Sequence, residues 1–367
     1  MKNNKYNPER GSKLLKFFDR YIGIPLVFSL GILKKRRVLP KEIKKIALLK
    51  TAAIGDTTIL TGVIKDIEEY NENIKMILFT GSSNYEFAKL LKEQFKNLEV
   101  VKLPIKNPID AIKVIKKYEY DVFLDFGPWP RLNAIFTFFS NSKYTVGFKT
   151  VNQFRHYIYD KYVLHKEDNH ELDNYKNIIK VIGIDKNNLP QITWINKNID
   201  DKIVTIHMFP GGSRSYLKEW SEDCWIKIIN YLTKNDKIVY LTGAKVDKIK
   251  AEKIKNSCDD KNKINVVAGE YSLEDTIKLL AKSKLVISID TGIMHIASAL
   301  DCNLIALHGP TSSKRWGPLN KNAVSINSDL ECAPCLNLGF EYGCNENKCM
   351  QKILPDFVIK KIRKFLE

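Results

Sequence analysis

The chain has 367 residues, of which 44% are hydrophobic and 10% aromatic, and its formal net charge is +17. This length predicts two domains that each bury a core, and the composition excludes a disordered chain. Residues 1–45 hold 13 Lys and Arg against 3 Asp and Glu, so +10 of the charge lies in an N-terminal arm. The remaining residues carry only +7, and we therefore expect no nucleic-acid partner.

The arm, residues 1–42, is basic and contains one apolar run from Tyr21 to Leu33. As a helix this run would be about 20 Å long, too short to span a hydrocarbon core of about 30 Å, and Pro25 interrupts it. The basic sequence KKRR follows at 34–37, which argues against a secretory signal. We expect the arm to lie in the interfacial region of a membrane, with its Lys and Arg cluster on anionic headgroups, and a helix packed on the protein's own body is the alternative. The residues expected at the lipid boundary are Phe17, Phe18, Ile22, Leu26 and Phe28.

Strand and helix patterns then alternate through residues 43–185, the predicted N-terminal domain. The expected elements are strand 44–50, helix 56–70, strand 75–81, helix 85–95, strand 98–103, helix 108–119, strand 121–126, helix 131–140, strand 144–148 and helix 171–183. Residues 186–201 lose the periodicity and carry turn formers, which favours a linker.

The alternation restarts in residues 202–367, the predicted C-terminal domain. The expected elements are strand 202–208, helix 221–234, strand 237–243, helix 245–256, strand 264–269, helix 273–283, strand 284–290, helix 292–300 and strand 303–309, with a helix at the C-terminus. Nearly continuous apolar strands between helices indicate parallel sheets covered on both faces. The predicted fold class is α/β, with two doubly wound domains that bind ligands at the carboxyl ends of their strands.

Polar and glycine-flanked groups gather at these strand ends. In chain order they are Lys50 with Asp56, Gly211 and Gly212 with Lys218, Asp247, and Asp290 with Thr291 and Gly292. Each has a plain structural interpretation as a helix cap, a turn or a solvated charge. The helix that begins after Asp290 also offers backbone N–H groups and a positive dipole end to a phosphate. The sequence has no G-x-G, no phosphate-loop motif and no Asp-x-Asp pair, so a diphosphate here would rely on backbone N–H groups and Lys218.

Five segments occur in the order and spacing of glycosyltransferase family 9, the ADP-heptose heptosyltransferases, over residues 43–365: LLKTAAIGDTTIL, PGGSRSYLKEW, LTGAKVD, DTGIMHIASAL and HGPTSSKRWGP. The arm also resembles the N-terminal extension of one branch of that family. The resemblance implies a GT-B fold, with two facing Rossmann-like domains and a cleft between them. It implies an inverting, metal-independent transferase that moves heptose from ADP-heptose to a hydroxyl of the lipopolysaccharide inner core.

The resemblance also implies roles for individual residues. Asp56 matches the general base, and Lys218 matches the lysine that neutralises the leaving diphosphate. Asp290 matches the carboxylate that binds the donor sugar, and His295 either orients it or contacts the ligand directly. The other donor-side positions are Gly211, Gly212, Ser213, Asp247 as a ribose ligand, and the amides of Thr291 and Gly292. On the acceptor side we expect Lys50 and Arg131, which could equally be a plain surface arginine.

Four of the seven cysteines lie close together: Cys332, Cys335, Cys344 and Cys349. Their C-x₂-C…C-x₄-C spacing favours a structural tetrahedral zinc site in a reducing cytosol, with disulfides as the competing interpretation. Iron is also possible, because some autotransporter heptosyltransferases that resemble this chain hold iron through cysteines. The four-cysteine segment therefore leaves a second hypothesis, in which the heptose is transferred to a protein acceptor. A non-catalytic zinc-ribbon protein that binds nucleic acid is a third hypothesis.

Overall fold

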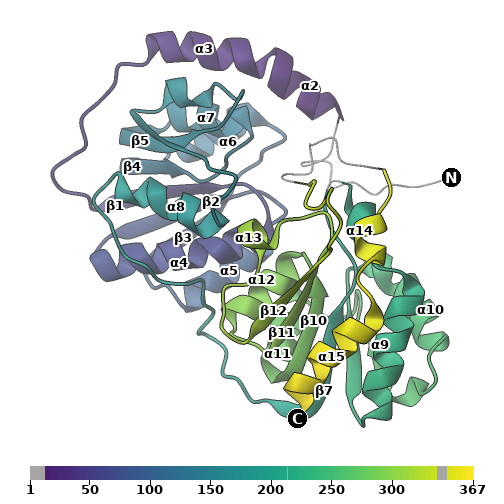
Figure 1. Cartoon of the computed structure of the whole chain (residues 1–367). Coiled ribbons are helices and arrows are strands. Elements are labelled where there is room, and N and C mark those ends of the chain that lie inside the picture. Colours follow the sequence, from purple (N-terminus) through teal and green to yellow (C-terminus); the bar gives the residue numbers. More distant parts are fainter. Residues whose placement is uncertain (1–12, 213, 337–344) are drawn as a thin grey trace. The chain divides into compact units, whose positions relative to one another are not determined.

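The computed structural model describes residues 13–212, 214–336 and 345–367. The chain divides into two compact units, Met1–Asn188 and Leu189–Glu367, which are described separately below (Figure 1). The division falls inside residues 186–201, where the sequence predicts a linker.

The first unit is built on a parallel sheet of six strands in the order β3-β2-β1-β4-β5-β6. The strands are β1 (Lys45–Lys50), β2 (Lys75–Thr80), β3 (Leu98–Lys102), β4 (Glu119–Asp125), β5 (Asn141–Lys149) and β6 (Lys161–Leu164). The helices that follow the arm are α4 (Ile54–Tyr70), α5 (Tyr85–Leu90), η1 (Leu91–Glu93), α6 (Pro108–Ile115), α7 (Arg131–Phe138), η2 (Arg155–Ile158) and α8 (Glu171–Lys180).

Side chains alternate along β1, and both faces of the sheet are buried at this strand. Ala47 and Leu49 share one core cluster with Ala111 and Ile115 of α6 and Phe136 of α7. Both faces of β1 are buried, because Ile46 and Leu48 are also fully inaccessible. Helix α8 packs against α4, and this contact brings residue 175 close to the start of α4.

The second unit repeats the design with a parallel sheet in the order β12-β11-β10-β7-β8-β9. The strands are β7 (Asp200–His207), β8 (Ile238–Thr242), β9 (Ile264–Val266), β10 (Ser283–Ile289), β11 (Leu304–His308) and β12 (Ala323–Asn327). The helices are η3 (Ser215–Lys218), α9 (Glu222–Lys234), η4 (Lys245–Asp247), α10 (Lys248–Asn256), η5 (Lys261–Lys263), α11 (Leu273–Lys282), α12 (Gly292–Ala299), α13 (Ser313–Trp316), α14 (Lys348–Gln351) and α15 (Pro355–Leu366).

One face of this second sheet packs in an apolar core with α9, α10 and α15. Ile289 of β10 and Leu307 of β11 belong to that core, together with Trp225, Ile254 and Ile362. Side chains alternate along a strand, so the residues before and after Ile289 and Leu307 point to the other face. Helix α12 packs against β10 and β11.

The predicted fold class is confirmed: both units are α/β with parallel sheets, as in the GT-B fold. The edge strands β6 and β12 were not predicted from the sequence. In β6 no residue is buried, and in β12 only Ile326 is. Neither strand therefore shows the apolar run by which a central parallel strand is recognised. Helix α5 ends at Leu90, where a short 3₁₀ turn replaces the expected continuation to residue 95.

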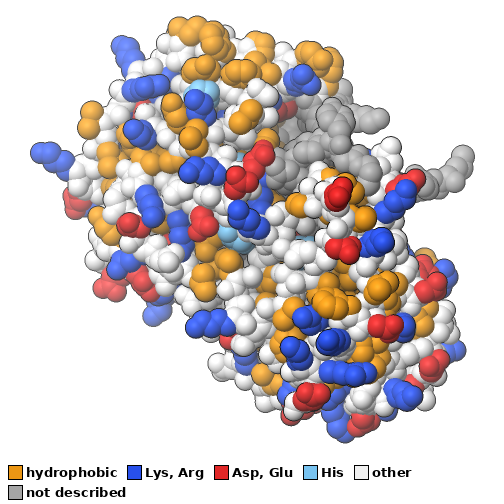
Figure 2. All heavy atoms as spheres, in the orientation of Figure 1, with side chains coloured by type: hydrophobic (Ala, Val, Ile, Leu, Met, Phe, Trp, Pro, Cys, Tyr) orange, Lys and Arg blue, Asp and Glu red, His pale blue; other side chains and the backbone are white. Residues whose placement is uncertain are grey.

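The N-terminal arm forms two helices, α2 (Lys13–Tyr21) and α3 (Gly23–Leu33). Val27 and Leu30 of α3 are buried against α7 and η2, so one side of α3 packs on the first unit. The opposite side is apolar and exposed, and Figure 2 shows apolar side chains gathered over this helix. The exposed large apolar residues of the arm are Phe17, Phe18, Tyr21, Ile22, Leu26, Phe28, Ile32, Leu33 and Val38. Within the described ranges, none of the helices has both the length and the apolar character needed to span a bilayer.

Candidate functional site

The second unit places Lys218 and Asp290 together at the carboxyl end of its sheet. Asp290 follows β10 directly, and Lys218 is the last residue of η3. The Lys218 Nζ atom lies 3.1 Å from the Asp290 Oδ2 atom and donates a second, longer hydrogen bond of 3.3 Å to the Asp290 backbone oxygen. The two side chains are 19% and 10% exposed, so water screens this ion pair only partly.

The charges around Asp290 keep it ionised. Burial acts to raise the pKa of the Asp290 carboxyl, but the Lys218 ammonium lowers that pKa well below its usual range. The carboxylate is therefore an acceptor for hydroxyl or ammonium donors at neutral pH. His295, on α12, is buried and close enough to contribute to this field.

Helix α12 begins beside this pair. Its N-cap residue, Thr291, makes no side-chain hydrogen bond to the first turn, and Thr291 and Gly292 are both half-buried. The first-turn N–H groups are therefore not capped by the threonine, and the turn is not sealed inside the core. Backbone N–H groups and the positive end of the helix dipole favour an anion at this position.

The other predicted donor-side residues surround the ends of β7 and β8. Gly211 and Gly212 are exposed, and Ser213 lies outside the described residues. The Asp247 carboxylate accepts a hydrogen bond of 2.8 Å from the backbone N–H of Ala244. Burial raises the pKa of Asp247, although the carboxyl still lies in solvent reach as a half-buried group.

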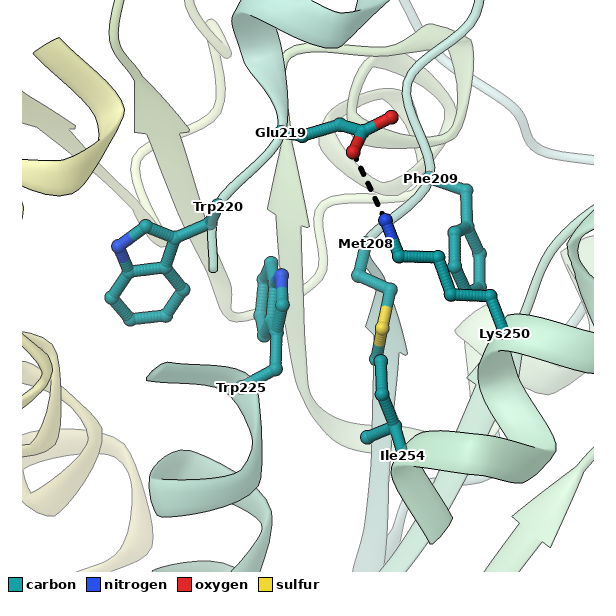
Figure 3. Close-up of a pocket in the computed structure, with 7 residues that line it drawn as sticks. All are labelled: Met208, Phe209, Glu219, Trp220, Trp225, Lys250 and Ile254. Atoms are coloured by element: carbon teal, nitrogen blue, oxygen red, sulfur yellow. Dashed lines mark hydrogen bonds and ion pairs between the residues drawn. The ribbon is translucent and has the colours of Figure 1, made fainter. Parts of the chain in front are cut away.

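A small pocket lies in the same region, between the end of β7 and helices α9 and α10 (Figure 3). Its lining is mainly apolar, and Glu219 and Lys250 form an ion pair of 3.0 Å beside it. The lining residues are Met208, Phe209, Glu219, Trp220, Trp225, Lys250 and Ile254. Lys250 and Glu219 also act electrostatically on Asp247, so the pocket adjoins the predicted ribose position.

In the first unit, Asp56 lies in the first turn of α4, and its carboxylate contacts Lys50, Tyr175 and, at 3.4 Å, the backbone N–H of Ala53. The Lys50 Nζ atom lies 2.7 Å from the Asp56 Oδ1 atom, and the Tyr175 hydroxyl donates to the same oxygen at 3.0 Å. Lys50 also donates to the Tyr175 hydroxyl, at 2.6 Å. The Asp56 side chain is 12% exposed, whereas Lys50 and Tyr175 are buried. These contacts fix the orientation of a carboxylate that retains access to a ligand.

Tyr175 was not predicted as a site residue. It lies in the predicted helix 171–183, where its position is typical of an aromatic residue on the core side of an amphipathic helix. The packing of α8 on α4, which the sequence does not reveal, brings its hydroxyl to Asp56.

Both cations predicted for the acceptor side, Lys50 and Arg131, contact other groups of the protein itself. The Lys50 ammonium contacts Asp56, Tyr175 and the backbone oxygen of Phe126, which accounts for its three donors. The Arg131 guanidinium donates to the carboxylate and the backbone oxygen of Asp19 in α2, and to the backbone oxygens of Asn152 and Gln153. Arg131 thus anchors the arm to the rest of the first unit. Direct contact of either cation with an acceptor stays a prediction and would require these bonds to break.

The predicted four-cysteine metal site is only partly inside the described residues, since Cys344 lies outside them. Cys332 is exposed, Cys335 half-buried and Cys349 buried. Cys335 and Cys349 both approach the loop after β11: the Cys335 N–H donates to the Pro310 oxygen, and a Cβ built at Gly309 would lie 3.2 Å from the Cys349 Sγ atom. Across the described ranges, no group of three His, Cys, Asp or Glu side chains is arranged to hold a metal, so the site remains a prediction.

A family model for glycosyltransferase family 9 (heptosyltransferase) matches residues 110–346. The chain belongs to glycosyltransferase family 9. Its match begins before α7 and includes Lys218, Asp290 and α12, whereas Asp56 lies upstream of it.

Other similarities agree with family 9 membership. Lipooligosaccharide heptosyltransferase 2 of Haemophilus ducreyi is 35% identical over 122 residues, which is 32% of this chain and 35% of the relative. The curated relatives are thus matched over about a third to a half of their length. Two solved structures share the fold. The E. coli ADP-heptose lps heptosyltransferase II has a TM-score of 0.71, 17% identity, and coverage of 88% of this chain and 98% of that chain. The E. coli heptosyltransferase WaaC with ADP-2-deoxy-2-fluoro heptose has a TM-score of 0.68, 18% identity, and coverage of 87% and 99%.

Proposed function

We propose that this chain is an inverting heptosyltransferase that moves heptose from ADP-heptose to a hydroxyl of the lipopolysaccharide inner core. The observation that carries the proposal is the Lys218–Asp290 ion pair beside the start of α12, inside the region that the family 9 model matches. This arrangement combines a cation, backbone N–H groups that the Thr291 side chain does not cap, and an ionised carboxylate within one unit. These groups suit the diphosphate and the sugar hydroxyls of a nucleotide sugar.

In the proposed reaction, Asp56 accepts the proton of the acceptor hydroxyl as its oxygen attacks the anomeric carbon of the heptose. The bond between that carbon and the β-phosphate oxygen breaks, and its electron pair leaves on ADP. Lys218 and the N–H groups of Thr291 and Gly292 neutralise the leaving diphosphate, so that no divalent cation is required. Lys50 and Tyr175 support this role of Asp56, because they orient its carboxylate through Oδ1.

The arm supports action at a membrane surface. Exposed Phe17, Leu26 and Phe28 would enter the interfacial region, and the exposed cations Lys35 and Arg36 would meet anionic headgroups. Buried Val27 and Leu30 would keep α3 attached to the first unit meanwhile. The lipid-anchored acceptor would then be presented where the enzyme binds. The proposed location is the cytoplasmic face of the inner membrane.

The test is a transfer assay with the full chain, ADP-heptose and a lipopolysaccharide core that lacks heptose, in the presence of EDTA. We expect the core to gain the mass of one heptose and ADP to be released in equal amount. Asp56→Asn should lower the rate about 10²- to 10⁴-fold while ADP-heptose affinity is kept. The matched control is Asp110→Asn, at an exposed carboxylate of α6 in the same unit. Absence of transfer by wild type, or a wild-type rate for Asp56→Asn, would refute the proposal.

The four-cysteine segment supports a second candidate acceptor, a hydroxyl of an autotransporter protein. The same assay with a purified passenger protein in place of the lipopolysaccharide core distinguishes the two. Under the leading proposal only the core gains mass. A heptose added to the protein and not to the core would establish the second function instead.

A further inference from the structure

His308 lies next to Asp290 at the edge of the second sheet, although no role follows for it from the proposed reaction. It is the last residue of β11, which runs parallel to β10 with Leu307 opposite Ile289. Continuing this register by one residue puts His308 beside Asp290. Since Ile289 and Leu307 face the apolar core, His308 and Asp290 both point to the opposite face, which α12 covers.

The imidazole of His308 is buried without a hydrogen-bond partner. The residue is 1% exposed, and in the described part of the chain neither ring nitrogen has an acceptor or a donor. Its backbone is fixed, because the Ser328 N–H donates to the His308 oxygen at 3.0 Å. Burial lowers the pKa of His308, so the ring is neutral and offers one donor and one acceptor. Buried polar groups are nearly always paired, which suggests that His308 forms its bond in another state of the site.

Lys218 has two competing partners, the Asp290 carboxylate and the donor diphosphate, of which the second rests on the proposed function. In the structure its ammonium contacts both the Oδ2 and the backbone oxygen of Asp290. If the ammonium turns to a bound diphosphate, Asp290 is left as a buried carboxylate without its cation. Such a carboxylate is strongly destabilised unless another donor replaces the lost one. Besides Lys218, the titratable side chains near this carboxylate are His308 and His295, and within the described residues both ring nitrogens of His308 are buried without a partner.

We propose that His308 donates a ring N–H to the Asp290 carboxylate when the donor diphosphate draws Lys218 away. His308 is then a positioning residue: it holds Asp290 in the orientation that receives the sugar hydroxyls. The Asp290 carboxylate thus pairs with Lys218 when no donor is bound and with His308 when the donor is bound. Lys218 can then neutralise the leaving diphosphate while Asp290 keeps its position for the sugar hydroxyls.

The test is ¹⁵N NMR of the full chain labelled at its six histidines, with His308→Gln used to assign the His308 signals. Adding ADP to saturation in EDTA should shift the His308 N–H nitrogen into the hydrogen-bonded range, while His156 of the first unit serves as the unmoved reference. Lys218→Met without ADP should produce the same shift. A His308 signal that stays in place, both in ADP-saturated wild type and in Lys218→Met, overturns the inference.

The two proposals can fail separately. If ADP does not bind the wild type at all, the proposed function fails, and the Lys218→Met spectrum still decides on His308. With turnover as a second readout, His308→Phe should lower kcat/KM for ADP-heptose about 10- to 100-fold, because a hydrogen bond to a charged group is lost. His308→Gln, which keeps an N–H donor, should lose clearly less. Equal losses in the two variants contradict a hydrogen-bonding role.

Discussion

Replacing Lys218 by Met removes the cation from a carboxylate that the protein keeps largely out of water. Breaking a fully buried ion pair costs about 3–5 kcal/mol, and an exposed pair contributes about 0–1 kcal/mol. With Lys218 19% and Asp290 10% exposed, we expect Lys218→Met to lower the free energy of unfolding by about 2–3 kcal/mol. The matched control is Lys250→Met: its pair with Glu219 has nearly the same length, 3.0 Å, but is about 40% exposed, so the loss should stay below about 1 kcal/mol.

Urea unfolding followed by tryptophan fluorescence measures this effect in the right unit. Four of the five tryptophans, Trp194, Trp220, Trp225 and Trp316, belong to Leu189–Glu367.

The pH dependence of the free energy of unfolding is a further check. The folded pKa of Asp290 is lowered, so its contribution to stability is present above its unfolded pKa of about 3.9 and is lost as the pH falls through the folded value. The difference between wild type and Lys218→Met should thus be complete at pH 7 and shrink below about pH 4. Equal losses for Lys218→Met and Lys250→Met would refute this reasoning.

Three further predictions concern other parts of the molecule. Tyr175→Phe should lower the transfer rate about tenfold without weakening ADP-heptose binding, because one hydrogen bond to the Asp56 carboxylate is lost; a rate equal to wild type argues against a positioning role. Leu26→Ser with Phe28→Ser should weaken sedimentation with anionic vesicles while the melting temperature stays near that of wild type, since both side chains are exposed; unchanged sedimentation contradicts the membrane proposal. Elemental analysis should find about one zinc or iron per chain, and Cys332→Ser should reduce it; a metal-free protein as purified from a reducing cytosol excludes the four-cysteine site.

Much of the fold could be predicted from the sequence, because parallel strands buried on both faces leave long apolar runs. The central strands β1, β4, β7 and β10 all show such runs, and the structure has them within a few residues of the expected bounds. The edge strands β6 and β12 are short and largely accessible, so nothing in their sequence separates them from loops.

The candidate site was predictable where neighbouring strand ends supply the groups. Lys218 and Asp290 could be placed at one edge of a sheet, and the structure shows them in contact. The partners of Asp56 could not be predicted, because Tyr175 reaches it from a helix that is 119 residues distant in sequence. The contacts of Arg131 could not be predicted for the same reason: its partner Asp19 belongs to the arm, whose docking on α7 depends on tertiary packing.

The central claim is that the second unit binds a nucleotide diphosphate through Lys218 and the start of α12 without a divalent cation. Calorimetric titration of the full chain with ADP in EDTA tests it most directly, with Lys218→Met and Lys263→Met titrated alongside. Lys263 pairs with Asp236 at 3.1 Å but lies directly before β9, at the amino end of that strand and away from the proposed site. We expect ADP to bind the wild type and Lys263→Met alike, and to bind Lys218→Met at least about tenfold more weakly, since a charge-assisted hydrogen bond is lost. Binding that requires Mg²⁺, or equal affinity in all three proteins, would contradict the claim.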